Sequence, residues 1–285
     1  MSDAIERFGL VLKFAGEHRL SDVLFKADSK PYYRRVGSLI ARPQEQVFTQ
    51  EDLAAVAQHV MAGEQMARFN AGREITLIHP LVGAGRFRIH VFRQRASIGL
   101  SVRVHPGRAR PLRDLGLPAA WSQLCGRHGA LVLVVGGAGQ GRTTTLGALV
   151  AALNEATPAR RIVTVGNCIE LSHVDKSGWT AQRTIGVDAP DWPAGVRGAM
   201  AQGADVMALD DMIDGDSWLA AIEAAERGVT VIATVAARDV GTAVGQVLAR
   251  IPVDKQVMAR RRLAPVLVGA TEQHLVPTPE GTKVA

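Results

Sequence analysis

The chain has 285 residues, enough for one large or two ordinary domains, and 47% of them are hydrophobic, so it can bury a sizeable core. The net charge is +6, but the arginines are scattered and only 5% of the residues are aromatic, so we expect no nucleic-acid partner. No apolar run of about 18 residues and no signal-peptide pattern occurs, which predicts a cytoplasmic protein.

The first part of the chain alternates helix and strand signals. The apolar spacing predicts helices over residues 2–20 and 49–66, and the second begins with a capping pattern, Thr49 to Asp52. Short apolar runs predict strands at 21–25 and 31–37. Period-two alternation from 86 to 104, broken at 94–97, predicts a hairpin. These signals indicate an α+β domain over residues 1–105.

Residues 106–112 are rich in proline, glycine and charge, which favours a linker. Beyond it, apolar strands separated by helices predict a second, α/β domain over residues 113–285, with a parallel sheet covered on both faces. The expected strands are Leu131–Val135, Val163–Val165, Val206–Leu209 and Val229–Ala233.

The first of these strands runs into a glycine-rich loop and then a helix. Gly136, Gly141 and Thr143 have the spacing of the phosphate-binding loop G-x-x-x-x-G-K-[ST], with Arg142 in place of the lysine. Glycines let backbone N–H groups turn towards phosphates, and the helix N-terminus adds positive potential. A plain strand–turn–helix is the alternative. The predicted nucleotide-binding residues are Gly136, Gly137, Ala138, Gly139, Gln140, Gly141, Arg142, Thr143 and Thr144.

Further segments stand in a recognisable order along the chain. They are Ser21-Asp22, Arg86-Phe87-Arg88, Leu112 to Pro118, Gln182-Arg183-Thr184-Ile185-Gly186, Val196 to Met200 and Ala224-Ala225-Glu226-Arg227-Gly228. Together with the phosphate loop, this order resembles the hexameric ATPases of type II and type IV secretion, most of all the pilus retraction (twitching motility) motors. The likeness runs from about Phe14 to about Val276.

The resemblance implies a PAS-like N-terminal domain and a RecA-like P-loop domain. It also implies ATP and Mg²⁺ as cofactors, with Thr143 and Asp210 as metal ligands. The partners it implies are a hexameric ring of identical subunits, or a mixed assembly with a complete pilus-type ATPase, at an inner-membrane pilus or secretion platform. In that family fold, strand 206–209 is expected beside strand 131–135.

Departures from the family pattern fall where chemistry would be done. The acidic box Glu-Asp-Pro-x-Glu reads Gly166-Asn167-Cys168-Ile169-Glu170, so only the last glutamate, Glu170, is kept. Asp211 stands at the catalytic glutamate position, and Ala236 replaces the box histidine. The remaining catalytic candidates are therefore Asp211 and Glu170. The family's C-terminal helical segment is also expected to be largely missing.

We interpret the chain as a degenerate motor paralogue that binds nucleotide weakly, hydrolyses little or none, and serves a type IV pilus or type II secretion motor as a regulatory or structural partner. Phosphoryl transfer depends on positioned charges, several of which are missing. One alternative is a slow but active hexameric ATPase that powers retraction or secretion, and another is nucleic-acid binding by the basic surface.

The resemblance also gives roles to residues outside the loop. It implies that Arg88, Arg95 and Arg103, on the N-terminal hairpin, reach a neighbouring subunit's nucleotide across a ring. A solvated strand face would show the same alternation, so this alternative stays open. Glu226 is expected to tie its helix in place rather than to act in catalysis.

Overall fold

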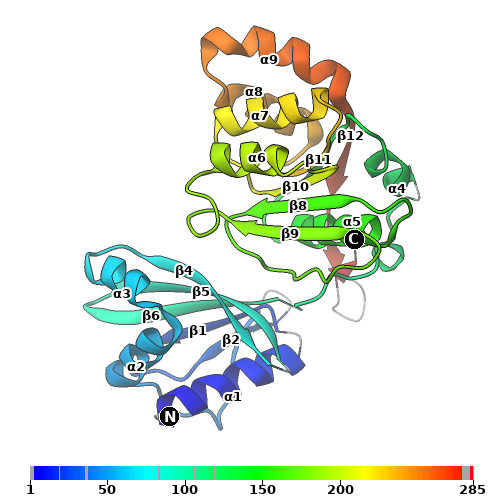
Figure 1. The fold of residues 1–285 in the computed structure, drawn as a ribbon. Helices are drawn as coiled ribbons and strands as arrows, with labels where there is room; N and C mark the ends of the chain where they lie inside the picture. The colour runs from blue at the N-terminus through cyan, green and yellow to red at the C-terminus, as the bar shows by residue number, and fades with distance from the viewer. Residues whose placement is uncertain are drawn as a thin grey trace. The chain divides into compact units, whose positions relative to one another are not determined.

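The structure is a computed structural model that describes residues 3–18, 20–35, 38–82, 84–105, 107–118, 120–277 and 283–284. The chain divides into two compact units, Met1–Gly107 and Arg108–Ala285, each with hydrophobic clusters of its own (Figure 1). No helix in these described ranges is long and apolar enough to cross a membrane.

The first unit is an antiparallel sheet with helices packed on one face. Its described strands run in the order β3-β2-β1-β6-β5-β4. Helices α1 and α2 contact β1 and β6, and their apolar side chains join the inward side chains of the strands in one core. The elements are α1 (Asp3–Glu17), β1 (Asp22–Lys26), β2 (Tyr32–Arg35), β3 (Ser38–Ala41), α2 (Gln50–Val60), α3 (Gly63–Asn70), β4 (Ile75–Leu81), β5 (Gly85–Gln94) and β6 (Ser97–His105).

The predicted hairpin is confirmed as β5 and β6. The two residues of its turn, Arg95 and Ala96, have φ angles of 46° and 60°, the left-handed values of a tight turn that follows the twist of the strands. The single helix predicted over 49–66 is wrong. Met61 is extended and buried, and the Gln65 side chain accepts a hydrogen bond from the Ala62 N–H, so a new helix, α3, begins there.

The second unit is a parallel sheet between two layers of helices. Its main sheet, among the described strands, has the order β12-β7-β11-β10-β8-β9. The elements are η1 (Leu112–Leu115), α4 (Ala120–Cys125), β7 (Leu131–Gly136), α5 (Arg142–Glu155), β8 (Arg161–Gly166), β9 (Trp179–Thr184), α6 (Trp192–Ala201), β10 (Val206–Asp210), α7 (Gly215–Glu226), β11 (Thr230–Ala236), α8 (Val240–Arg250), α9 (Val253–Val266), β12 (Leu267–Gln273), β13 (Val276–Pro277) and β14 (Lys283–Val284).

Alternate side chains of β7 enter two cores. Leu131, Leu133 and Val135 pack with α6, α7 and α9, whereas Val132 and Val134 pack with α5. Burial on both faces explains why the central strands are continuous apolar runs. The α/β class and the parallel sheet are thus confirmed, and Figure 1 shows α5 on one side of the sheet and α6 and α7 on the other.

The expectation that strand 206–209 lies beside strand 131–135 is wrong, because β11 lies between them. Ala208 of β10 pairs with Ile232 of β11, which in turn pairs with Val132 of β7. The chain leaves β10, crosses through α7 and returns as β11 at the next position of the sheet. Because β11 is buried from Thr230 to Val235 and most of these residues are apolar, a central position suits it. As a result, the end of β11 separates the glycine loop from the end of β10.

Candidate nucleotide-binding site

The glycine loop joins β7 to α5 at the carboxyl edge of the parallel sheet. Gly139 and Gly141 have φ angles of +73° and +85°, which glycine adopts without strain. A Cβ atom on Gly136 would lie 3.1 Å from the Gln273 carbonyl oxygen and 3.2 Å from the Gln140 Cβ, so this position is crowded. Helix α5 begins directly after Gly141, and the first backbone N–H groups of a helix have no acceptor within it. The loop therefore has the geometry of an anion cradle.

Asp210 ends β10 and accepts two hydroxyl hydrogen bonds. Thr143 Oγ1 donates to Oδ2 at 3.0 Å, and Thr234 Oγ1 donates to Oδ1 at 2.7 Å. Burial raises the pKa of Asp210, while the two hydroxyl donors lower it. A threonine hydroxyl and an aspartate are the protein groups that hold Mg²⁺ in P-loop NTPases, so this pair fits that ion.

Arg142 and Asp211 form an ion pair across the loop. Arg142 Nη1 lies 2.8 Å from Asp211 Oδ1, and the arginine side chain is only 13% exposed against 55% for the aspartate. Asp211 has a left-handed φ of 63°, and its N–H donates to Thr234 Oγ1 at 2.8 Å. The two residues that the resemblance places at the lysine and catalytic glutamate positions are thus engaged with each other.

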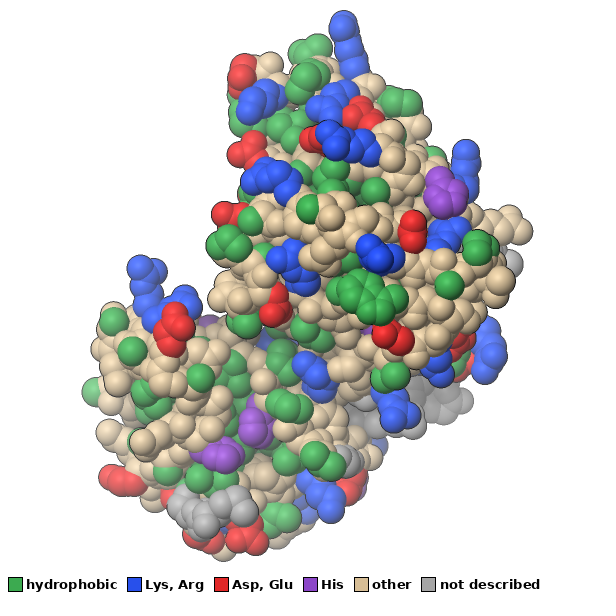
Figure 2. All heavy atoms as spheres, in the orientation of Figure 1, with side chains coloured by type: hydrophobic (Ala, Val, Ile, Leu, Met, Phe, Trp, Pro, Cys, Tyr) green, Lys and Arg blue, Asp and Glu red, His purple; other side chains and the backbone are tan. Residues whose placement is uncertain are grey.

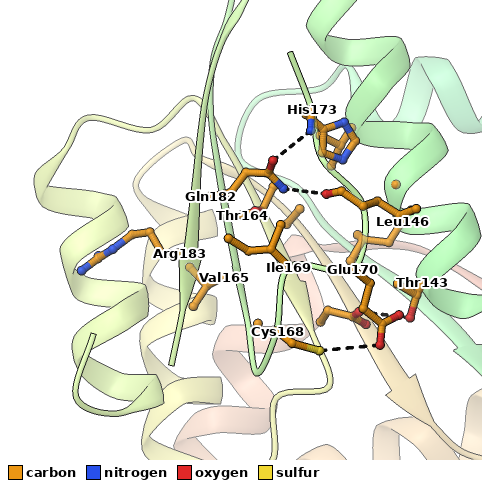
Figure 3. Close-up of a pocket in the computed structure, with 16 residues that line it drawn as sticks. Thr143, Leu146, Thr164, Val165, Cys168, Ile169, Glu170, His173, Gln182 and Arg183 are labelled. Carbon is orange, nitrogen blue, oxygen red and sulfur yellow. Dashed lines mark hydrogen bonds between the residues drawn. The ribbon is translucent and has the colours of Figure 1, made fainter. Parts of the chain in front are cut away.

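A small cavity of about 50 Å³ lies beside this cluster, between α5 and the ends of β8 and β10. A water needs roughly 10–15 Å³ of such volume, so the cavity can hold a few waters or a partly hydrated cation. Thr143, Asp210 and Glu170 all line it, and Figure 3 shows Glu170 pointing towards Thr143. The Cys168 thiol donates to Glu170 Oε1 at 3.6 Å. The cavity therefore offers hydroxyl and carboxylate oxygens.

The loop that carries Glu170 is held by Gln182 of β9, whose role the sequence did not indicate. Gln182 Oε1 accepts from the His173 N–H, and its Nε2 donates to the Leu171 carbonyl, both at 2.8 Å (Figure 3). Thr234 was also missed, although it joins Asp210 to Asp211. The available sequence signal was a threonine near the end of the apolar run that forms β11, and the structure shows this threonine to be buried.

Two other sequence-predicted positions, Asn167 and Ala236, lie at the ends of β8 and β11, where Ala236 pairs in register with Gly136, and the three arginines lie in the first unit. Asn167 and Ala236 are exposed. Arg88 and Arg103 pair across β5 and β6, and Arg103 Nε donates to Asp22 at 3.0 Å. Arg95 is exposed in the hairpin turn. Asp22 thus restrains Arg103 within its own unit.

The comparisons with known proteins agree with this fold. Residues 116–280 match the family model described as type II/IV secretion system protein, which is more than half of the chain. The chain therefore belongs to this family, and pilus retraction motors are among the proteins it is similar to.

Two sequence relatives and one solved structure illustrate the likeness. The chain is 27% identical to the uncharacterized Escherichia coli K12 protein YggR, over 93% of this chain and 80% of the relative. It is 26% identical to the type IV pilus retraction ATPase PilT of Pseudomonas aeruginosa, over 96% and 79%. A crystal structure of the pilus retraction motor PilT with bound ADP superposes with a TM-score of 0.87 at 27% identity, over 97% of this chain and 80% of that one.

Proposed function

We propose that this chain is a nucleotide-binding subunit of a pilus-motor-type assembly that hydrolyses little or no ATP and acts as a regulatory or structural partner of the motor. The observation that carries the proposal is the Arg142–Asp211 ion pair of 2.8 Å. In a P-loop NTPase the cationic side chain binds the terminal phosphates, and a neighbouring polar group orients the attacking water. Here each of these two groups neutralises the other.

Nucleotide binding is supported by the loop itself. The glycine φ angles, the start of α5 and the Thr143–Asp210 pair would hold the phosphates and Mg²⁺ of ATP or ADP. Bound Mg·ATP would supply the phosphoryl group for any transfer. We expect weak binding, because the phosphates must compete with Asp211 for Arg142.

Low hydrolysis is supported by the groups around the loop. Asp211 is one methylene shorter than glutamate, and a missing C–C bond withdraws its carboxylate by roughly 1.5 Å. Asn167 has no charge, and Ala236 has no polar side-chain group to sense a phosphate. Phosphoryl transfer depends on catalytic groups placed within about an ångström. The combined changes at these positions are therefore expected to reduce the rate of hydrolysis severely.

One observation favours the alternative of a slow, active ATPase. Glu170 is 9% exposed and lines the same cavity as Thr143 and Asp210, so a carboxylate is present where a water could be held. A basic nucleic-acid surface receives no comparable support. On the face shown in Figure 2, the described lysine and arginine side chains are interspersed with acidic and apolar ones.

A nucleotide titration tests the binding half of the proposal. ADP and ATP are titrated into the purified chain by calorimetry, with Mg²⁺ and with EDTA. We expect weak, saturable binding that Mg²⁺ strengthens, and Thr143→Ala should remove the Mg²⁺ dependence. Arg127→Ala, in the same unit but outside the loop, is the matched control. If neither ADP nor ATP binds, the proposal is refuted.

We also propose that the chain works in the cytoplasm as part of a ring, either with copies of itself or with a complete pilus-type ATPase, at a pilus or secretion platform of the inner membrane. The exposed Arg95 supports a role towards a neighbouring subunit, as an arginine finger has in trans. A change at Arg103 would also break its contact with Asp22, so Arg95 is the better residue to substitute.

Co-purification with a complete pilus motor, followed by ATPase assays of the mixture, tests this assembly. The wild-type chain should bind the motor and change its rate, and Arg95→Glu should weaken that effect. Arg73→Glu reverses another exposed arginine of the same unit and should leave the effect intact. A chain that stays monomeric, and neither binds the motor nor alters its rate, would contradict the assembly proposal.

A further inference from the structure

Gln273 is a buried glutamine whose amide has no hydrogen-bond partner within the described part of the chain. It ends β12, is only 5% exposed, and leaves both Nε2 and Oε1 unsatisfied. An unpaired buried polar group destabilises the folded protein, so its presence calls for an explanation. β12 is the neighbour of β7, and Gln273 pairs in register with Gly136, the first glycine of the loop.

The amide lies at the start of α5. A Cβ atom built on Gly141, the residue that caps this helix, would be 3.6 Å from Gln273 Nε2. The segment that follows is fixed to the loop, because the Leu275 N–H donates to Gln140 Oε1 at 2.5 Å. The backbone on both sides of Gln273 is therefore tied to the phosphate loop, by the strand pairing and by this hydrogen bond.

The position of β12 in the sheet shows which end of a ligand the amide would meet. In the order β12-β7-β11-β10, Gln273 lies on one side of the loop strand and Asp210 on the other. Thr143 and Asp210 would hold Mg²⁺ at the terminal phosphates. A side chain on the β12 side of the loop then faces the end of the ligand opposite to these phosphates. In a nucleotide, that end carries the sugar. An amide suits a sugar hydroxyl, because it can both donate and accept.

We propose that Gln273 is a ligand-binding residue of this site, and that its amide recognises the sugar end of a nucleoside diphosphate or triphosphate. The inference rests on the proposed function, because it needs a loop that binds nucleotide. It explains why a polar side chain is kept in a buried position where the free protein gives it no partner in the described structure.

Paired titrations with Mg·ADP and with Mg·pyrophosphate test this role, since pyrophosphate lacks the sugar. Gln273→Leu keeps the size of the side chain but removes both polar atoms. We expect its affinity for ADP to fall about tenfold, the effect of one or two lost hydrogen bonds, while its affinity for pyrophosphate stays unchanged. Gln273→Met is a second apolar replacement, in case the branched leucine packs poorly, and should behave alike.

The thermal midpoint Tm of the free protein gives an independent readout. Removing an unpaired buried amide should raise Tm in Gln273→Leu. Gln256→Leu is the matched control, because the Gln256 amide donates to the Ile251 carbonyl at 2.9 Å, so its loss should lower Tm without changing either affinity.

The remaining outcomes contradict the inference in different ways. Unchanged ADP affinity in Gln273→Leu, or an equal loss for ADP and pyrophosphate, would refute the sugar contact and leave the proposed function standing. A Tm below that of the wild type would mean that the amide is already paired in the free protein, and would also refute it. A wild-type chain that binds neither ligand would overturn both proposals together.

Discussion

Asp211→Asn removes the charge that engages Arg142 and leaves the shape of the site almost unchanged. Asparagine tolerates the left-handed φ of 63° about as well as aspartate does, so the backbone need not move. The N–H of residue 211 can still donate to Thr234 Oγ1. The substitution therefore isolates the ion pair, and the prediction is that nucleotide binds more tightly to the variant.

The size of the expected gain in affinity follows from how exposed the Arg142–Asp211 ion pair is. Exposed ion pairs contribute about 0.2–1 kcal/mol, and Asp211 is 55% exposed, which limits this pair to that range. The 2.8 Å contact and the 13% exposure of Arg142 place it at the upper end, about 1 kcal/mol. If phosphates must displace Asp211, removing the charge should improve ADP affinity about fivefold.

Calorimetric titration of Mg·ADP at low and high salt measures this change. Glu223→Gln is the matched control, because it breaks another arginine–carboxylate pair, Arg227 to Glu223 at 2.6 Å, near the end of α7 and away from the loop. The control should bind ADP like the wild type, and the gain in Asp211→Asn should shrink as salt screens the pair. Equal or weaker binding by Asp211→Asn would refute the competition.

Three further predictions concern the same unit. Arg142→Lys should bind ADP somewhat more tightly in the same titration but release almost no phosphate, because the other catalytic groups remain absent. Arg262 lowers the pKa of Glu226, so this pair stabilises the fold above the ordinary glutamate pKa of about 4.3; the Tm difference between wild type and Glu226→Gln should vanish as pH falls below that value. Thr234→Val should lower the free energy of unfolding in urea by about 1–3 kcal/mol, because it removes a donor to buried Asp210.

The part of the site that is local in sequence was predictable. An apolar strand, spaced glycines and a helix start stand within residues 131–146, and the structure has them as β7, the loop and α5. The contacts of Arg262 with both carboxylate oxygens of Glu226 also agree with the expected structural role of Glu226, since they tie α7 to α9. The strand, loop and helix signals need only neighbouring residues and a buried environment.

The non-local part was not predictable. Arg142 and Asp211 are separated by 69 positions, and only the inserted β11 brings Thr234 between their two segments. β12 escaped prediction because it is a partly buried edge strand that mixes apolar residues with Gly269, Thr271 and Glu272, so its period is weak. Without that strand, nothing in the sequence places Gln273 beside the loop.

Phosphate release by the purified wild-type chain with saturating Mg·ATP tests the central claim most directly. We predict turnover far below the typical 1–100 s⁻¹ of phosphoryl-transfer enzymes such as kinases, with no difference between wild type and Arg142→Ala. Turnover of the order of one per second that depends on Mg²⁺ and disappears in Arg142→Ala would contradict the claim and identify an active motor.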